Sequence, residues 1–274
     1  MTELNTEGFE YLLDFQKLNE LIYHLSKSFI GKNNDDLIKI KSTHLIAKIT
    51  DNCFSLLKLI PNSNLDKFKD NYLDIHSTLS LIRNIIEQAN IYWYLIIDNT
   101  SKEESELKQL LFDYHDALSL EFISLNLFLD NNTTQNSNEQ IVELKTAIET
   151  NSAFKLLDKN TQKMILQGKK NSLLTQSEIV KKRGINLDEF KSYYMLMSTS
   201  THSSPTSLRI LAFEKNGDNE KPNVLSEGLL FMSLHYCSFF LADLIKTTVK
   251  LWKLEISNKK AVEIIKKYTW DKNL

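Results

Sequence analysis

The shortage of glycine and proline constrains the fold of this chain more than any other feature of its sequence. The 274 residues include only six Gly and three Pro, far below the usual shares of about 7% and 5%. Sheet proteins place both residues in their many tight turns, whereas helix interiors avoid them. The sequence therefore predicts long helices joined by few tight turns.

Apolar residues recur with the helical period along most of the chain. In Phe9–Phe29 they form one face, which contains Leu12, Phe15, Leu18 and Ile22. We expect further helices over residues 35–60, 65–97, 101–129, 139–149, 161–168, 175–184, 186–202, 224–255 and 257–270. This pattern predicts an all-α protein, a single multi-helix bundle of about eight to ten helices that forms one domain over residues 1–274.

Short polar motifs mark where several of these helices begin and end. Ser101 with Glu104 has the spacing of a capping box, and Gly184 is well placed to cap the C-terminus of the 175–184 helix. The segment 131–138 consists almost wholly of Asn, Thr, Gln and Ser, which is typical of an exposed linker. We interpret it as a candidate boundary between two sub-lobes.

Composition and charge exclude several classes of protein. Apolar residues make up 42% and charged residues 25%, so the chain is globular rather than disordered. The 33 basic and 35 acidic residues give a net charge of −2, which argues against a general nucleic-acid coat. No DNA-specific motif is present. The N-terminal residues lack the features of a signal peptide, so we expect a cytoplasmic protein.

The most apolar stretch, Leu229–Ile245, is a candidate membrane span by hydropathy alone. It contains His235 and Asp243 and is shorter than the roughly 20 apolar residues that a membrane helix needs. We therefore expect a buried core helix and no membrane association. Cys53 and Cys237 lie in apolar segments far apart and match no metal-binding spacing, which predicts buried free thiols. With no paired His motif, phosphate loop or dinucleotide fingerprint, we expect neither metal nor cofactor.

A polar stripe along the predicted helix 65–97 is the first candidate for a functional site. Arginine is rare here, with three residues against thirty lysines, and one of them, Arg83, lies in this stripe one turn before Glu87 and two turns before Asn90. An arginine at the edge of a buried face favours planar, multidentate recognition of an anion. The alternative is an Arg83–Glu87 ion pair that only holds two helices in register.

A second polar line follows the predicted helix 186–202, where Tyr194, Ser198 and His202 recur every four residues. An imidazole beside hydroxyl groups could take part in general acid–base chemistry. The alternative is a histidine that caps its own helix, because the helix dipole favours an imidazolium at the C-terminus.

Together the two segments, SLIRNIIEQANIYWYLI and FKSYYMLMSTSTHSSPTSL, resemble the bacterial family called domain of unknown function 5677. That family has an R-x-x-x-E helix, matched here by Arg83 and Glu87. Its later Y-x-x-x-S-x-x-x-H segment is matched by Tyr194, Ser198 and His202. The resemblance spans residues 65–245 and implies a helical fold rather than a particular activity.

The chain also has a looser likeness to HEPN-type helical bundles, many of which are metal-independent ribonucleases of toxin and phage-defence systems. Their signature is an arginine followed after four to six residues by a histidine. No histidine follows any of the three arginines at that spacing. The pair would therefore have to be completed across the fold, by Arg83 and His202.

Two hypotheses about function follow. In the first, the protein is a binding or regulatory module, potentially of a bacterial defence or toxin-type system, that recognises RNA or a partner protein. In the second, it is a metal-independent ribonuclease with Arg83, Glu87 and His202 as catalytic residues. Tyr194, Ser198 and Asn90 would then contact the substrate. We also expect a homodimer, since the apolar segments 229–241 and 91–95 exceed what one helix stripe needs.

Overall fold

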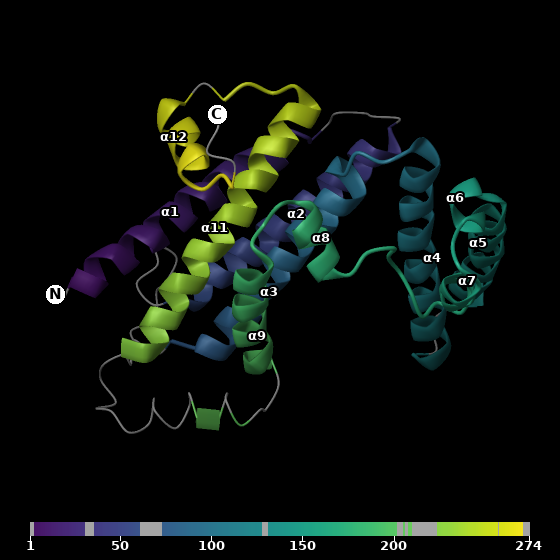
Figure 1. Cartoon of the computed structure of the whole chain (residues 1–274), viewed down its shortest axis with the longest axis horizontal. Helices are drawn as coiled ribbons and strands as arrows, with labels where there is room; N and C mark the ends of the chain where they lie inside the picture. The colour runs from purple at the N-terminus through teal and green to yellow at the C-terminus, as the bar shows by residue number, and fades with distance from the viewer. Residues whose placement is uncertain are drawn as a thin grey trace. The chain divides into compact units, whose positions relative to one another are not determined.

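The computed structural model describes residues 3–30, 36–60, 73–127, 131–201, 205, 208–209, 224–256 and 258–270. Within these ranges the chain forms eleven α-helices and one short π-helix, and no β-strand occurs there (Figure 1). The predicted all-α fold is confirmed. The chain divides into two compact units, Met1–Ile97 with Gln176–Leu274 and Asp98–Thr175.

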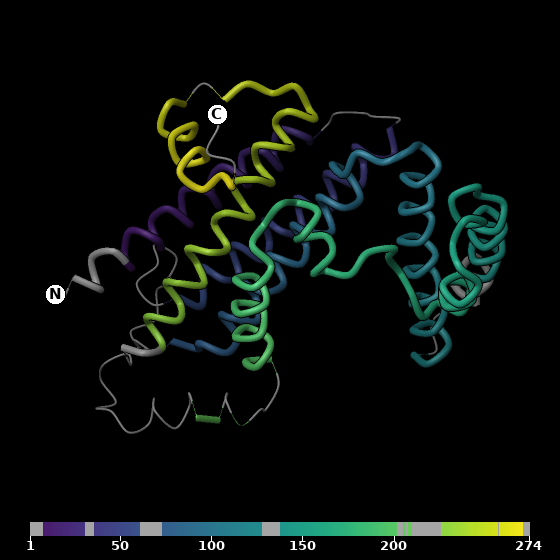
Figure 2. Tube along the Cα trace, in the orientation of Figure 1, coloured from purple at the N-terminus to yellow at the C-terminus, as the bar shows by residue number. Residues whose placement is uncertain are grey.

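The first unit is a bundle built from both ends of the chain. Helix α1 packs against α11 and α2, α2 packs against α3, and α3 contacts both α9 and α11. The tube in Figure 2 shows α1 and α11 side by side, although they are the first and the penultimate helices of the chain. These elements are α1 (Glu3–Lys27), α2 (Leu37–Leu59), α3 (Ile75–Tyr92), the π-helix η1 (Trp93–Ile97), α8 (Gln176–Lys182), α9 (Leu187–Thr201), α11 (Val224–Trp252) and α12 (Lys259–Lys267).

The core of the first unit contains the apolar faces that the sequence pattern predicts. Phe15, Leu18 and Ile22 of α1 are fully buried, and so are Cys53 and Cys237, which are free thiols as expected. The helices that contain Arg83, Ser198 and Leu234 also pack together in this unit. Helix α3 contacts α9 and α11, and the rings of Tyr193 on α9 and Tyr236 on α11 stack with centroids 4.1 Å apart.

The second unit has a small core of its own. It comprises α4 (Lys102–Asn126), α5 (Asn131–Thr150), α6 (Ser152–Lys155) and α7 (Lys159–Leu166). Its buried core side chains are Leu107, Leu111, Tyr114, Ile148, Phe154 and Ile165. The side-chain amide of Gln162 donates hydrogen bonds to the carbonyl oxygens of Phe154 and Leu157, at 3.0 Å in both cases, and so ties α7 to the end of α6.

Most predicted helix ends are observed. Ser101 Oγ accepts a hydrogen bond from the backbone N–H of Glu104 at 3.2 Å, which caps α4. Gly184, with φ = 73°, ends α8 in the left-handed conformation, and Ile185 N–H donates to the carbonyl oxygen of Val180 at 3.1 Å. This backbone bond is the signature of a Schellman cap.

Two boundaries differ most from the prediction. Helix α3 begins at Ile75, because the side chain of Asp74 accepts a hydrogen bond from Ser77 N–H and caps the helix there. Residues 65–72 of the predicted helix lie outside the described part of the chain. The polar segment 131–138, interpreted above as a linker, is the first part of α5 and lies inside the second unit. No glycine or proline interrupts it, and the apolar residues Ile141, Leu144 and Ile148 anchor the same helix to the second core.

The apolar segments that suggested a homodimer are used within the chain. In α11, Leu234, Cys237, Phe240 and Leu241 have no exposed surface, and in the 91–95 segment Tyr92 is buried as well. Met232 of the same segment is 53% exposed, so the homodimer stays a prediction. Helix α11 is, over Ser226–Trp252, long and apolar enough to span a membrane, but 61% of its most apolar window is buried inside the protein.

Candidate functional site

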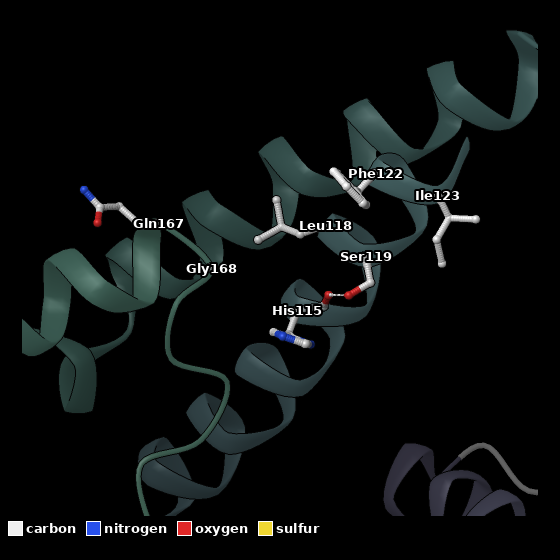
Figure 3. A pocket seen from close by; sticks show the side chains of 7 residues that line it. All are labelled: His115, Leu118, Ser119, Phe122, Ile123, Gln167 and Gly168. Carbon is white, nitrogen blue, oxygen red and sulfur yellow. Dashed lines mark hydrogen bonds between the residues drawn. The ribbon is translucent and has the colours of Figure 1, made fainter. Parts of the chain in front are cut away.

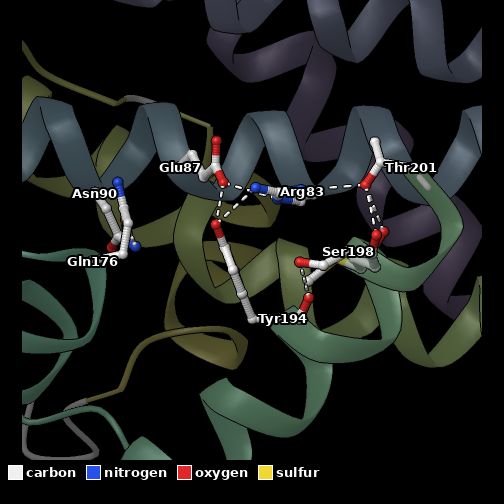
Figure 4. A network of polar contacts seen from close by, with 8 residues as sticks. Arg83, Glu87, Asn90, Gln176, Tyr194, Ser198 and Thr201 are labelled. Carbon is white, nitrogen blue, oxygen red and sulfur yellow. Dashed lines mark hydrogen bonds and ion pairs between the residues drawn. The ribbon is translucent and has the colours of Figure 1, made fainter. Parts of the chain in front are cut away.

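Arg83 on α3 donates hydrogen bonds to three residues, two of which lie on α9 (Figure 4). Its Nε donates to Glu87 Oε1 at 2.9 Å, its Nη2 to Tyr194 Oη at 2.9 Å and its Nη1 to Thr201 Oγ1 at 3.2 Å. The Tyr194 hydroxyl in turn donates to the same Glu87 oxygen at 2.5 Å. We call this set, Arg83, Glu87, Tyr194 and Thr201, the α3–α9 network.

The helical period of α3 explains the placement of the two charged residues. Arg83 and Glu87 are one turn apart and lie at the edge of the buried face, beside the buried residues Ile82 and Ile86. Their side chains retain 23% and 28% of their exposure. At such half-buried positions an ion pair is screened less than on an open surface, so its hydrogen-bond geometry matters more.

The ionisation of Arg83 and Tyr194 reflects this shared environment. Burial opposes the charge of the guanidinium, but the Glu87 carboxylate and the Tyr194 hydroxyl together outweigh burial and raise the pKa of Arg83. Burial also raises the pKa of the Tyr194 hydroxyl, and its hydrogen bond to Glu87 raises it further. Tyr194 is therefore a protonated donor at neutral pH, which fits its bond to the carboxylate.

Of the predicted polar line of Tyr194, Ser198 and His202, the structure shows only Tyr194 bonded to Arg83. Ser198 Oγ donates to the carbonyl oxygen of Tyr194 at 2.6 Å, so it bonds within its own helix and is not joined directly to Arg83. Thr201, which the sequence reasoning missed, takes the place next to the guanidinium. His202 lies outside the described residues, although its neighbour Thr201 contacts Arg83.

Asn90, predicted to share a site with Arg83, belongs to a separate buried network. Its amide Nδ2 donates to Gln176 Oε1 at 2.8 Å (Figure 4), and its Oδ1 accepts from Arg183 Nη1 at 2.5 Å. Arg183 Nη2 donates to Asp243 Oδ2 at 2.6 Å. Because Asn90 is fully buried, it is not placed to contact a substrate in solution.

Arg183 is the central residue of this second network. Only 3% of its side chain is exposed, and its guanidinium lies 5.1 Å from the centre of the Phe240 ring. Burial lowers the pKa of Arg183, and the Asp243 carboxylate partly offsets that effect. The network joins α3, α8 and α11 across the core of the first unit.

The sequence contains a signal for the Arg183–Asp243 pair. Asp243 is the only Asp, Glu, Lys or Arg in the apolar stretch 229–245, and Arg183 is one of three arginines. A carboxylate buried in an apolar helix requires a cationic partner. A scarce arginine on another helix was therefore a natural candidate for that partner, but the sequence does not tell which arginine it is.

Among the residues that the structure describes, no group of three or more His, Cys, Asp and Glu side chains could hold a metal ion. Comparisons with known proteins returned no match: no family model, curated protein or solved structure matches this chain.

Proposed function

We propose that this protein is a non-catalytic binding module, in which the α3–α9 network fixes the position of α9 on α3. The proposal rests on the hydrogen bonds that Arg83 makes within the protein. Each of its three nitrogen atoms already donates to an acceptor within the protein. A guanidinium engaged in this way supports a structural role more than the recognition of a substrate phosphate.

The carboxylate of Glu87 supports the same interpretation. One of its oxygens accepts from both Arg83 and Tyr194, so the acid is bound on one side by two donors from two helices. A general base needs an oxygen directed at the proton that it removes. Glu87 instead orients Arg83 and Tyr194 relative to each other, and its role is that of a positioning residue in a scaffold.

A second candidate function, a metal-independent ribonuclease, is favoured by one contact. Thr201 accepts a hydrogen bond from Arg83, and the next residue in the chain is His202. Each Nη atom of an arginine carries a second N–H, which could bind a phosphate oxygen. In this alternative His202 would remove the proton from a ribose 2′-hydroxyl and Arg83 would stabilise the charge on the phosphate.

One experiment separates the two functions. The purified protein is incubated with RNA in excess chelator, beside the variants Arg83→Ala and His202→Ala. The binding module is expected to cleave no RNA. Cleavage by the wild type that both substitutions abolish would overturn the proposal and establish the ribonuclease. Circular dichroism of each variant checks that a loss of activity is not a loss of fold.

A further inference from the structure

Helix α4 has an exposed apolar stripe that the second unit does not use in its own core. Leu120, Ile123 and Leu127 recur at intervals of three and four residues, and their exposed fractions are 45%, 43% and 67%. The buried residues of the same helix include Leu107, Leu111 and Tyr114. A helix with a second, exposed apolar face is typical of a surface that binds another molecule.

A hollow of about 400 Å³ adjoins the stripe (Figure 3). Ile123 belongs to both features, and Phe122 next to it in the chain lines the hollow, so a ligand on the stripe would also reach the hollow. The Ser119 hydroxyl donates to the backbone carbonyl of His115 at 2.8 Å, within the helix. The hollow therefore suits an apolar side chain. Its lining residues are His115, Leu118, Ser119, Phe122, Ile123, Gln167 and Gly168.

Gly168 shapes one wall of this hollow. With φ = 69° it ends α7 in the left-handed conformation, and a Cβ atom at this position would lie 2.5 Å from Leu118 Cδ1. The α7 turn therefore approaches α4 closely through its backbone. This contact holds the wall of the hollow in place without filling it with a side chain.

The charge of α4 indicates the kind of partner that fits. The helix contains six acidic and two basic residues, and one of the two, Lys108, is buried against Asp98 at 2.7 Å. Asp116 is exposed and lies in line with the stripe, one turn before Leu120. The opposite rim of the hollow is formed by Gly168, which is followed in the chain by the basic residue Lys169. The acidic residues of this surface therefore lie on α4.

We infer that the α4 surface, defined as Asp116, Leu120, Phe122, Ile123 and Leu127 with the adjoining hollow, binds a basic amphipathic helix of another protein. The apolar stripe of that helix covers Leu120, Ile123 and Leu127, one of its side chains enters the hollow, and Lys or Arg residues face Asp116. The inference rests on the proposed binding function and names its partner class. A second copy of α4 on this surface would bring acidic helices together, and an anionic membrane would be repelled.

The test uses the full chain and a fluorescently labelled helical peptide of Leu and Lys, about five helical turns long. Fluorescence anisotropy is expected to show binding that Phe122→Ser and Asp116→Lys each weaken about tenfold or more, which corresponds to about 1.4 kcal/mol. Matched controls are Ile30→Ser and Asp51→Lys, both at exposed positions of the first unit. These controls are expected to leave the affinity unchanged. A peptide with the same Leu stripe but Glu in place of Lys is expected not to bind.

Three results would overturn the inference. The first is equal binding by all variants, and the second is equally tight binding of the Leu–Glu peptide. The third is an absence of peptide binding together with a dimer that Phe122→Ser dissociates in sedimentation equilibrium, because the occupant would then be a second copy. None of these results depends on RNA cleavage, so a failure here is distinguishable from a failure of the proposed non-catalytic function.

Discussion

The hydroxyl of Tyr194 and the carboxylate of Glu87 are 2.5 Å apart although 107 residues separate them in the chain. The same carboxylate oxygen accepts from Arg83, so the tyrosine completes an ion pair that α3 forms by itself. This bond makes a local i,i+4 pair part of the packing between α3 and α9, and its contribution can be measured.

We expect Tyr194→Phe to lower the free energy of unfolding by about 1 kcal/mol. The substitution removes one hydroxyl that both accepts from Arg83 and donates to Glu87, and a hydrogen bond of this kind contributes about 0.5–1.5 kcal/mol. Urea denaturation measures the change. Tyr193→Phe on the same helix is the control, because the contact of Tyr193 with Tyr236 is a ring stack that phenylalanine preserves. Equal effects at the two positions would contradict a specific role for the Tyr194 hydroxyl.

We expect Arg83→Lys to destabilise the protein by about 1–3 kcal/mol, although it conserves the charge. A lysine ammonium is a compact donor and does not reproduce the planar fork, which here reaches Glu87, Tyr194 and Thr201 together. Glu87 and Tyr194, which are half-buried, would each lose a hydrogen bond from the guanidinium. The measurement is again urea denaturation, with Lys17→Arg on α1 as a control for lysine–arginine exchange at an exposed position. A neutral Arg83→Lys would show that charge alone matters.

In the second unit, we expect Lys108→Met to lower the free energy of unfolding by about 3–5 kcal/mol, because it removes the ammonium group that pairs with the buried Asp98 carboxylate. Only 1% of the Lys108 side chain and 3% of the Asp98 side chain are exposed. The double variant Lys108→Met with Asp98→Leu is expected to regain most of that loss. Hydrogen exchange of the α4 amides reports on this unit separately from the first.

The control for this pair is Lys102→Met, whose side chain is 84% exposed and whose contact with Glu106 is 3.8 Å long. Exposed pairs of this kind contribute little to stability, so no measurable change is expected. If Lys108→Met were equally neutral, the buried pair would not stabilise the second unit.

The stability of the first unit is expected to depend on pH through Asp14. Burial tends to raise the pKa of this carboxyl, but hydrogen bonds from Lys267, Lys17 and Tyr268 outweigh burial, and its pKa in the folded protein is lowered. The unfolded state therefore binds a proton at higher pH, near the ordinary value of about 3.9. The stabilisation is present above that pH and is lost as the pH falls through the lower folded value.

Asp14→Asn tests this assignment. The variant is expected to be less stable than the wild type at neutral pH, and the difference is expected to shrink as the pH is lowered from about 5 toward the folded pKa. Urea denaturation at a series of pH values measures it. A difference that stays constant with pH would indicate that Asp14 contributes by packing rather than by its charge.

Local patterns were enough to place most helices. The shortage of glycine and proline, the apolar periods and the capping residues Ser101 and Gly184 are short-range features, and each helix end that they indicate is set mainly by neighbouring residues. The prediction was wrong where the local signal was composition alone. The Asn- and Thr-rich start of α5 has the composition of a linker, but it is the first part of a helix that Ile148 anchors to the second core.

The candidate site was predictable only within α3. Arg83 and Glu87 are one turn apart, so the helical period alone brings their side chains together. The separation of Asn90 from that pair was not predictable, since it follows from the approach of α8 and α11 and from the partner that Arg183 finds there. A polar stripe on one helix shows which side chains share a face. It does not show which other helix packs against each of those side chains.

By itself, the sequence determined the helical class, the positions of most helices and the Arg83–Glu87 pair, because backbone hydrogen bonds, caps and i,i+4 contacts depend on residues within a few turns. Only the tertiary structure decided that the chain forms two units. It also decided that Arg83 bonds Tyr194 and Thr201 while Asn90 bonds Arg183. The physical reason is that these contacts join residues about 90 to 120 positions apart, and which helices meet depends on how all the apolar faces are buried together.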